Sequence, residues 1–117
     1  AFQVTVINGK LNLLWNQRSV DTVLGLPFNI ASYGLLLHLL AKEANLQEGR
    51  LIGFLADTHV YVNHVEGAKE QLTRDPNLYP LPKIQTQNFT SLFDWKAEDS
   101  VIEGYQSFPK IAFPIAV

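Results

Sequence analysis

The chain opens with two runs in which apolar and polar side chains alternate. The apolar positions are Phe2, Val4 and Val6 in the first run and Leu11, Leu13 and Trp15 in the second. Asn8-Gly9 stands between the runs, and both residue types tolerate the positive φ angles of a type I′ turn. Alternation joined by such a turn predicts a β-hairpin. The residues from Arg18 to Pro27 are expected to form a loop, because Gly25 and Pro27 break regular structure.

The stretch from about Phe28 to Ala44 predicts a helix that is apolar on nearly every side. Its apolar side chains are Ile30, Ala31, Tyr33, Leu35, Leu36, Leu37, Leu39 and Leu40. A helix of this kind that is too short to span a membrane is normally the buried central helix of a domain. Burial of this helix requires protein on all sides, which a chain of 117 residues is expected to supply only with difficulty.

Shorter signals predict the remaining elements. Glu48-Gly49 is expected to turn the chain into a buried strand over Arg50–Ala56. Asn63 and Glu66 have the spacing of a capping box, which predicts a helix that runs to about residue 74. Further strands are expected over residues 83–87, 101–105 and 111–113, with a helical turn near residues 91–95. These elements indicate the α+β class, without a linker long enough to divide domains.

Composition argues against several classes of function. Lys and Arg total 9 against 11 Asp and Glu, and the net charge of −2 does not favour a nucleic-acid surface. No apolar run approaches the roughly 20 residues of a membrane span. The 117 residues include no Cys, which excludes disulfides and thiolate metal sites and is compatible with a reducing cytosol. His59 and His64 have a spacing that does not favour a metal site either.

One short segment, residues 17–21, combines a guanidinium, a hydroxyl and a carboxylate. Arg18 beside Ser19 suits a phosphate, because Arg can donate two parallel charge-assisted hydrogen bonds and Ser adds another donor. The alternative is a surface salt bridge between Arg18 and Asp21, which the pattern alone favours.

Three further polar side chains have both a functional and a structural interpretation. His59 and Tyr61 share one face if residues 58–62 are extended, and could bind a sugar hydroxyl or be ordinary edge residues. Asn29, near the start of the predicted helix, is typical of an N-cap.

The order of these motifs resembles one enzyme family. Residues 17–21 (QRSVD) and 24–33 (LGLPFNIASY) closely resemble the signature of thymidylate synthases. Residues 57–61 (DTHVY) with 63–64 resemble the family's second nucleotide-binding stretch, and residues 98–99, 103–105 and 116–117 resemble its tail. The likeness covers the whole chain. It implies the C-terminal part of the thymidylate synthase fold, a twisted mixed β-sheet packed on a buried central helix, with residues 1–117 as one segment of the catalytic domain.

The resemblance implies methylation of dUMP to dTMP, with 5,10-methylenetetrahydrofolate as carbon donor and reductant and without a metal. A cysteine thiolate of the family adds to the pyrimidine ring, which is covalent catalysis. Arg18 and Ser19 would hold the phosphate, Asn29 would read the pyrimidine edge, and His59 and Tyr61 would bind the deoxyribose hydroxyl. The implied dUMP-binding residues are Gln17, Arg18, Ser19, Asp21, Asn29, His59 and Tyr61.

The same resemblance implies a folate side to the pocket. Asp21 would accept hydrogen bonds from the pterin, and Leu24, Gly25 and Phe28 would line that side. Ala116 and Val117 would close over both ligands as a lid that excludes water. The implied catalytic residues are Arg18, Asp21 and Asn29.

Two features depart from the family pattern. The family's nucleophile lies in a Pro-Cys-His motif a few residues upstream of the strand that contains Phe2, so this chain, which has no Cys, is expected to be inactive alone. Leu55-Ala56 stands where the family usually has glycine. An alternative enzyme is a deoxycytidylate hydroxymethylase, against which Asn29 argues, because an acceptor such as Asp would suit the amino group of cytosine.

A non-catalytic dimerising fragment is a further alternative, from another functional class. The family forms dimers that pack sheet against sheet, so a homodimer, or a complex with the complementary N-terminal half, is expected in a cytoplasmic location. The alternating apolar residues of the hairpin, from Phe2 to Trp15, are expected to supply part of the dimer face.

Overall fold

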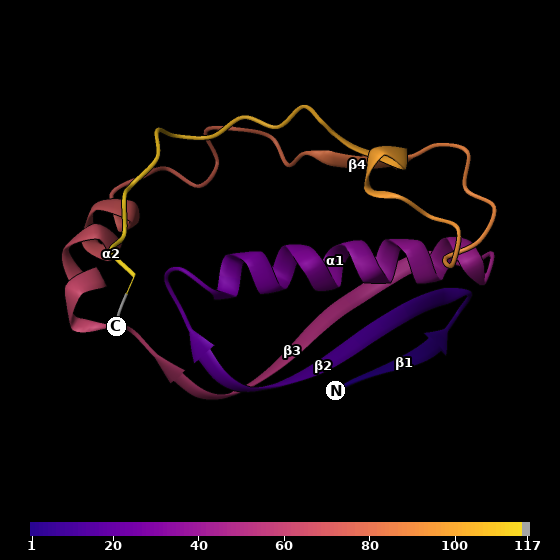
Figure 1. Ribbon diagram of the computed structural model, residues 1–117, viewed down its shortest axis with the longest axis horizontal. Coiled ribbons are helices and arrows are strands. Elements are labelled where there is room, and N and C mark those ends of the chain that lie inside the picture. Colours follow the sequence, from indigo (N-terminus) through magenta and orange to yellow (C-terminus); the bar gives the residue numbers. More distant parts are fainter. Residues whose placement is uncertain (116–117) are drawn as a thin grey trace. The chain divides into compact units, whose positions relative to one another are not determined.

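The computed structural model describes residues 1–115, and the chain divides into two compact units (Figure 1). Residues 1–61 form the first unit, and the second begins at Val62. The elements of the first unit are β1 (Phe2–Ile7), β2 (Lys10–Asp21), α1 (Leu26–Glu43) and β3 (Gln47–His59). All of the polar motif at residues 17–21 and its predicted partners up to Tyr61 belong to this unit.

The predicted hairpin is confirmed. Strands β1 and β2 pair antiparallel, with Phe2 opposite Trp15 and Ile7 opposite Lys10. Asn8 and Gly9 connect them with φ angles of 51° and 73°. Positive φ at both central residues is the geometry of a type I′ turn, whose twist matches that of the two strands.

The third strand joins the sheet in the other direction. Strands β2 and β3 pair in parallel, from Lys10 opposite Gln47 to Asp21 opposite His59. Parallel neighbours need a crossover connection, and α1 supplies it. The sheet order is β1-β2-β3, which is a mixed sheet with one helix across it, so the expected α+β class and twisted mixed sheet are confirmed.

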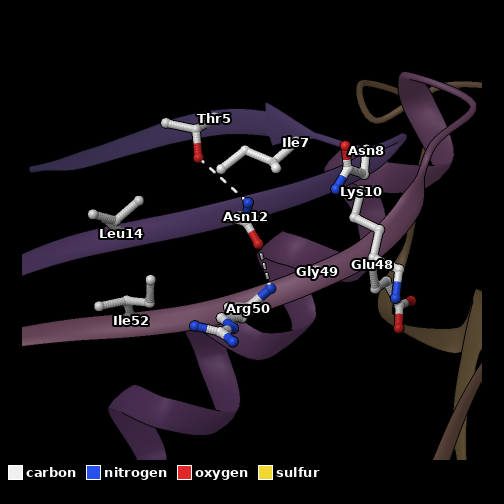
Figure 2. A pocket seen from close by; sticks show the side chains of 10 residues that line it. All are labelled: Thr5, Ile7, Asn8, Lys10, Asn12, Leu14, Glu48, Gly49, Arg50 and Ile52. Atoms are coloured by element: carbon white, nitrogen blue, oxygen red, sulfur yellow. Dashed lines mark hydrogen bonds between the residues drawn. The ribbon is translucent and has the colours of Figure 1, made fainter.

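The sheet face away from α1 carries mixed polar and apolar side chains (Figure 2). Asn12 lies at an irregularity in the pairing of β2 with β3. Its amide nitrogen donates to the hydroxyl of Thr5 over 3.5 Å, and its amide oxygen accepts from the backbone N–H of Arg50 over 2.7 Å. Asn12 therefore satisfies a backbone donor where the regular ladder is interrupted.

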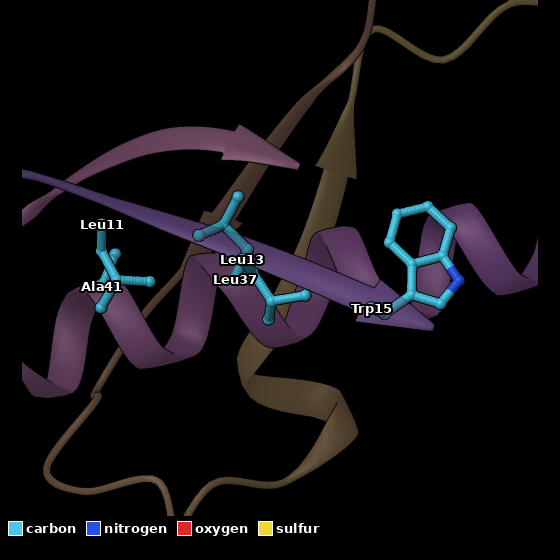
Figure 3. Close-up of a cluster of buried hydrophobic side chains, with 5 residues drawn as sticks. All are labelled: Leu11, Leu13, Trp15, Leu37 and Ala41. Carbon is cyan, nitrogen blue, oxygen red and sulfur yellow. The ribbon is translucent and has the colours of Figure 1, made fainter. Parts of the chain in front are cut away.

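The face toward α1 holds the core (Figure 3). Leu11, Leu13 and Trp15 are buried there against Leu37 and Ala41 of the helix. The period of two residues in a strand places these three side chains on one face. Because β1 pairs with β2 in register, Phe2, Val4 and Val6 fall on this same side. Leu11, Leu13 and Trp15 are buried by the chain's own helix and are therefore not available to a dimer face, whereas Phe2, Val4 and Val6 of β1 are exposed.

Helix α1 is buried along only part of its length. Leu37, His38, Leu39 and Ala41 are buried, all of them in its second half. Phe28 near its start is 70% exposed and Ile30 is 46% exposed. The first turns of the helix are therefore exposed within the described chain, where one sheet covers one face of the helix.

Two predicted boundaries in the first unit are also wrong. Strand β2 continues through the predicted loop as far as Asp21, because β3 pairs with it over that distance. Glu48 and Gly49 lie inside β3 and make no turn. The turn comes earlier, at Asn45, which has a φ of 52° directly after the helix C-cap residue Ala44. Asn tolerates this left-handed conformation, and helices commonly end in this way.

The second unit contains short elements. They are η1 (Val62–His64), α2 (Val65–Leu72), β4 (Lys83–Thr86), η2 (Ala97–Asp99) and β5 (Ser100–Glu103). Strands β4 and β5 form an antiparallel pair, which confirms two of the predicted strands. Residues 111–113 form no strand, and α2 ends before Arg74. His64 occupies the N-cap position without a side-chain capping bond, so the predicted Asn63 capping box is wrong.

Within the described residues, no helix is long and apolar enough to cross a membrane.

Candidate nucleotide site

The polar motif lies at the edge of the sheet where two parallel strands end. Ser19 pairs with Asp57 and Asp21 pairs with His59, so the carboxyl ends of β2 and β3 are adjacent. Helix α1 begins at the same edge, since only a short turn separates Asp21 from Leu26. Crevices beyond the carboxyl ends of parallel strands are the usual ligand sites of such sheets. The helix N-terminus adds exposed N–H groups and a partial positive charge that favours an anion.

Arg18 and Asp21 do not neutralise one another. In the part of the chain that the structure describes, Arg18 makes no ion pair with Asp21. The Asp21 carboxylate instead accepts the backbone N–H groups of Val23 and Leu24 through Oδ1, over 3.2 and 3.3 Å. The surface salt bridge that the pattern alone favoured does not form. Arg18 and Ser19 are both exposed, and the guanidinium is accessible to an external anion.

Asn29 is not the helix cap. Gly25 occupies the N-cap position, and Asn29 lies in the first turn with its backbone N–H bonded to the Gly25 carbonyl over 3.1 Å. Its side-chain Oδ1 accepts from Gln17 Nε2 over 2.8 Å. This bond joins β2 to α1 and holds the Asn29 amide in one orientation. Asn29 therefore does not have the capping role that its position near the start of the helix suggested.

Gln17 is itself held by two groups of β2. Trp15 Nε1 donates to Gln17 Oε1 over 3.1 Å, and Gln17 Nε2 donates to the Ser19 carbonyl over 3.2 Å. Trp15 is a member of this network that the hydrophobic pattern did not reveal, because the pattern counts its ring as core and ignores its N–H.

His59 and Tyr61 lie close together at the end of β3. The strand ends at His59, so Tyr61 is beyond it and the expected extended segment 58–62 is too long. Their rings nevertheless meet edge to face, with centroids 5.1 Å apart. His59 Nδ1 lies 3.2 Å from the Asp57 carbonyl, which can only accept. In the neutral imidazole this bond places the proton on Nδ1 and makes Nε2 the acceptor.

The predicted folate residues surround the turn between β2 and α1. A Cβ atom at Gly25 would lie 3.3 Å from both Cβ and the carbonyl oxygen of Asp21, so the turn packs tightly at this position. Leu24 is half-buried in the turn and Phe28 projects from the first turn of the helix. Ala116 and Val117, the predicted lid, lie outside the described residues.

Comparison with known proteins shows the family of the chain. The family described as thymidylate synthase matches residues 1–117. The chain belongs to the thymidylate synthase family. It is 49% identical over 115 residues to the bifunctional dihydrofolate reductase-thymidylate synthase of Paramecium tetraurelia. That match covers 98% of this chain and 24% of the relative's length.

Among residues 1–115, no cluster of His, Asp or Glu side chains is suited to hold a metal ion. The structure accommodates both side chains at residues 55–56, where the family usually has glycine. Leu55 lies against the core cluster, and Ala56 is exposed.

Proposed function

We propose that this chain forms the dUMP- and folate-binding part of a thymidylate synthase, which methylates dUMP to dTMP with 5,10-methylenetetrahydrofolate. One observation carries the proposal: the carboxyl ends of β2 and β3 lie side by side at the N-terminus of α1, where Asp21 pairs with His59 and Gln17 bonds to Asn29. Family membership supports the reaction, and the chain corresponds to 24% of a bifunctional relative, so it supplies part of such an enzyme.

The phosphate of dUMP would bind to Arg18 and Ser19. A phosphate offers several acceptor oxygens, and a guanidinium can donate to two of them in parallel. The first turn of α1 contains no acidic residue that would repel the anion. Gln17 and Asp21 complete the nucleotide-binding stretch of β2.

The uracil ring would be read by Asn29, and the deoxyribose by His59 and Tyr61. An amide offers one donor and one acceptor group, which match O4 and N3–H of uracil. With Nδ1 of His59 bonded to the Asp57 carbonyl, Nε2 can accept from a sugar hydroxyl. Tyr61, in ring contact with His59, supplies a second polar group at that position.

The folate would lie over the turn that leads into α1. Asp21 uses Oδ1 for its two backbone partners, so Oδ2 can accept from the pterin. Leu24, Gly25 and Phe28 would line that side, and exposed Phe28 provides an apolar surface for the ring. Ala116 and Val117 would close over both ligands. Arg18, Asp21 and Asn29 are the proposed catalytic residues.

The reaction requires a thiolate that these 117 residues do not contain, since the chain has no Cys. The isolated chain therefore binds ligands but does not turn them over. A nucleophile supplied by a preceding part of the catalytic domain, or by a separate N-terminal half, would complete the site.

Dimerisation would use the sheet face opposite α1. A depression of about 850 Å³ on this face is lined by residues that include Thr5, Ile7, Leu14 and Ile52 (Figure 2). Ile7 is 60% exposed and Ile52 is 42% exposed. Exposed apolar residues that share one face favour association, and a two-fold dimer is its commonest closed form. The proposed location is the cytoplasm, as is general for this family.

A chimera tests the proposal. This chain replaces the matching segment of the Paramecium enzyme, and formation of dTMP from dUMP and methylenetetrahydrofolate is measured. We expect turnover by the chimera, none by the isolated chain, and strong loss in an Arg18→Ala chimera. Lys69→Ala, which removes an exposed cation of α2 in the second unit, is the control and retains activity. Hydroxymethylation of dCMP would instead identify a deoxycytidylate hydroxymethylase, and a folded chimera that binds no nucleotide would indicate a non-catalytic dimerising segment.

A further inference from the structure

We propose that Trp15 is a positioning residue that sets selectivity for uracil over cytosine, because its indole N–H determines through Gln17 which way the Asn29 amide points. The inference rests on the proposed role of Asn29 as the reader of the pyrimidine edge. It assigns a function to a core side chain that does not itself touch the nucleotide.

The orientation of Gln17 follows from the chemistry of its two neighbours in β2. An indole nitrogen can only donate a hydrogen bond, so the Gln17 atom that faces Trp15 Nε1 at 3.1 Å must be the amide oxygen. A backbone carbonyl can only accept, so the atom that faces the Ser19 carbonyl at 3.2 Å must be the amide nitrogen. If the Gln17 amide were turned by half a rotation, both bonds would be lost. Its Nε2 would then face the donor Trp15 Nε1, and its Oε1 would face the acceptor carbonyl of Ser19.

The orientation of the Gln17 amide determines that of the Asn29 amide. Since Gln17 presents Nε2, the atom of Asn29 that lies 2.8 Å away is the acceptor Oδ1. The Nδ2 group of Asn29 therefore points away from Gln17 and is the donor offered at the site. If the Asn29 amide were turned, its N–H group would face the N–H group of Gln17. The hydrogen bonds from Trp15 through Gln17 therefore exclude that orientation of Asn29.

Only one pyrimidine suits the amide in this state. Uracil presents the acceptor O4 beside the donor N3–H, whereas cytosine presents a donor amino group beside the acceptor N3. An Asn side chain that turns by half a rotation exchanges its donor and acceptor and would suit cytosine equally well. A locked amide can discriminate between the two bases, and an unlocked amide cannot, because the two amide orientations have nearly the same shape.

The packing around Trp15 holds its ring in place and so fixes the direction of its N–H group. Its ring is buried and stacks on Tyr33, with centroids 5.0 Å apart and planes 17° apart. Gly53 of β3 makes room for it, since a Cβ atom there would lie 2.5 Å from the indole ring. In Figure 3 the indole nitrogen lies on the side of the ring away from Leu13 and Leu37. Packing thus aims the N–H at the polar network.

A purely structural role for Trp15 makes a different prediction. A buried indole N–H needs a hydrogen-bond partner, and Gln17 would satisfy it even if the nucleotide were never read. In that case the loss of the N–H would lower stability and weaken dUMP and dCMP equally. The ratio of the two dissociation constants therefore separates positioning from packing.

The test uses the full chain and calorimetric titration with dUMP and with dCMP. Trp15→Phe keeps an aromatic ring on Tyr33 and removes the only indole donor to Gln17. Trp95→Phe is the matched control, because Trp95 Nε1 donates to Ser100 Oγ over 3.0 Å in the second unit. We expect the preference for dUMP to fall about tenfold in Trp15→Phe, the effect of one net hydrogen bond. Trp95→Phe should keep the wild-type ratio.

Gln17→Glu keeps the test decisive if Trp15→Phe does not fold. A carboxylate still accepts from Trp15 but cannot donate to Asn29, which then turns its Nδ2 toward it and offers Oδ1 to the base. The preference should shift toward dCMP. An unchanged ratio in folded Trp15→Phe, or in Gln17→Glu when the first variant unfolds, overturns the positioning role. A wild-type chain without preference for dUMP overturns the proposed role of Asn29 itself, and the two failures are thereby distinguished.

Discussion

Two adjacent leucines in β2 provide a direct test of the sheet's two faces. Leu13 is 0% exposed and packs in the cluster beneath α1. Leu14 points to the opposite face and lines the depression there. Leu→Ala at a fully buried position costs about 2–5 kcal/mol, because the cavity remains when the surroundings cannot collapse. Leu13→Ala should lie near the middle of that range, since other side chains of the cluster keep the sheet and α1 apart and limit collapse into the cavity.

Leu14→Ala should cost about 1 kcal/mol in the free chain, because the side chain is only partly removed from water. A difference of about 2 kcal/mol between the variants corresponds to about 1 M in the urea midpoint for a protein of this size. Urea unfolding at several chain concentrations measures both effects. The Leu13→Ala loss should be the same at every concentration. The Leu14→Ala loss should grow with concentration if the opposite face is a dimer interface, because association then contributes to stability.

Equal costs at the two positions would refute the assignment of the faces. A one-residue shift of β2 would exchange Leu13 and Leu14 between core and surface, since the side-chain period of a strand is two. A larger cost at Leu14 in a monomeric sample would therefore show that the core is built on the other set of residues.

Three further changes test the site and its support. Arg18→Ala should weaken dUMP binding by about 1.5–3 kcal/mol in titration calorimetry, because it removes charge-assisted bonds, and an unchanged affinity would exclude the phosphate role. Asn29→Asp should favour dCMP over dUMP in the same titration, because a carboxylate accepts but cannot donate. Gly53→Ala should lower the free energy of unfolding by about 1–3 kcal/mol, since its methyl group displaces the Trp15 ring, and a wild-type urea midpoint would contradict that packing.

Local signals predicted the first part of the fold well. The Asn8-Gly9 turn and the alternating residues around it define the hairpin, because both are short-range properties of the chain. The parallel pairing of β2 with β3 joins segments separated by a whole helix, and no local pattern indicates it. This pairing extends β2 through its expected loop and places Glu48 inside β3. The errors at these boundaries are consequences of a tertiary contact.

The candidate site was only partly predictable for a similar reason. The residue types at 17–21 suggested an anion site, yet the pattern also allowed an Arg18–Asp21 salt bridge, which the observed Asp21 contacts replace. Asn29 had the position of a cap by its sequence, and the structure shows its side chain bonded to Gln17 instead. Family resemblance supplied these roles earlier than residue chemistry could. It did not indicate Trp15, whose contribution depends on the direction of one N–H group.

The hydrophobic core and the candidate nucleotide site follow one another along β2, so a change in the core can move side chains at the site. Leu13, Trp15 and Gln17 occupy successive positions on the face toward α1, and burial decreases along them from the core to the site. Gln17 is held by Trp15, and Asn29 is held by Gln17, so the position of the reading amide depends on how β2 packs against α1. A change that moves the indole, such as a side chain at Gly53, should therefore alter base selectivity without contact with the nucleotide. With Asn29 as the proposed reader of the base, specificity would depend on core packing as much as on the residues that face the ligand.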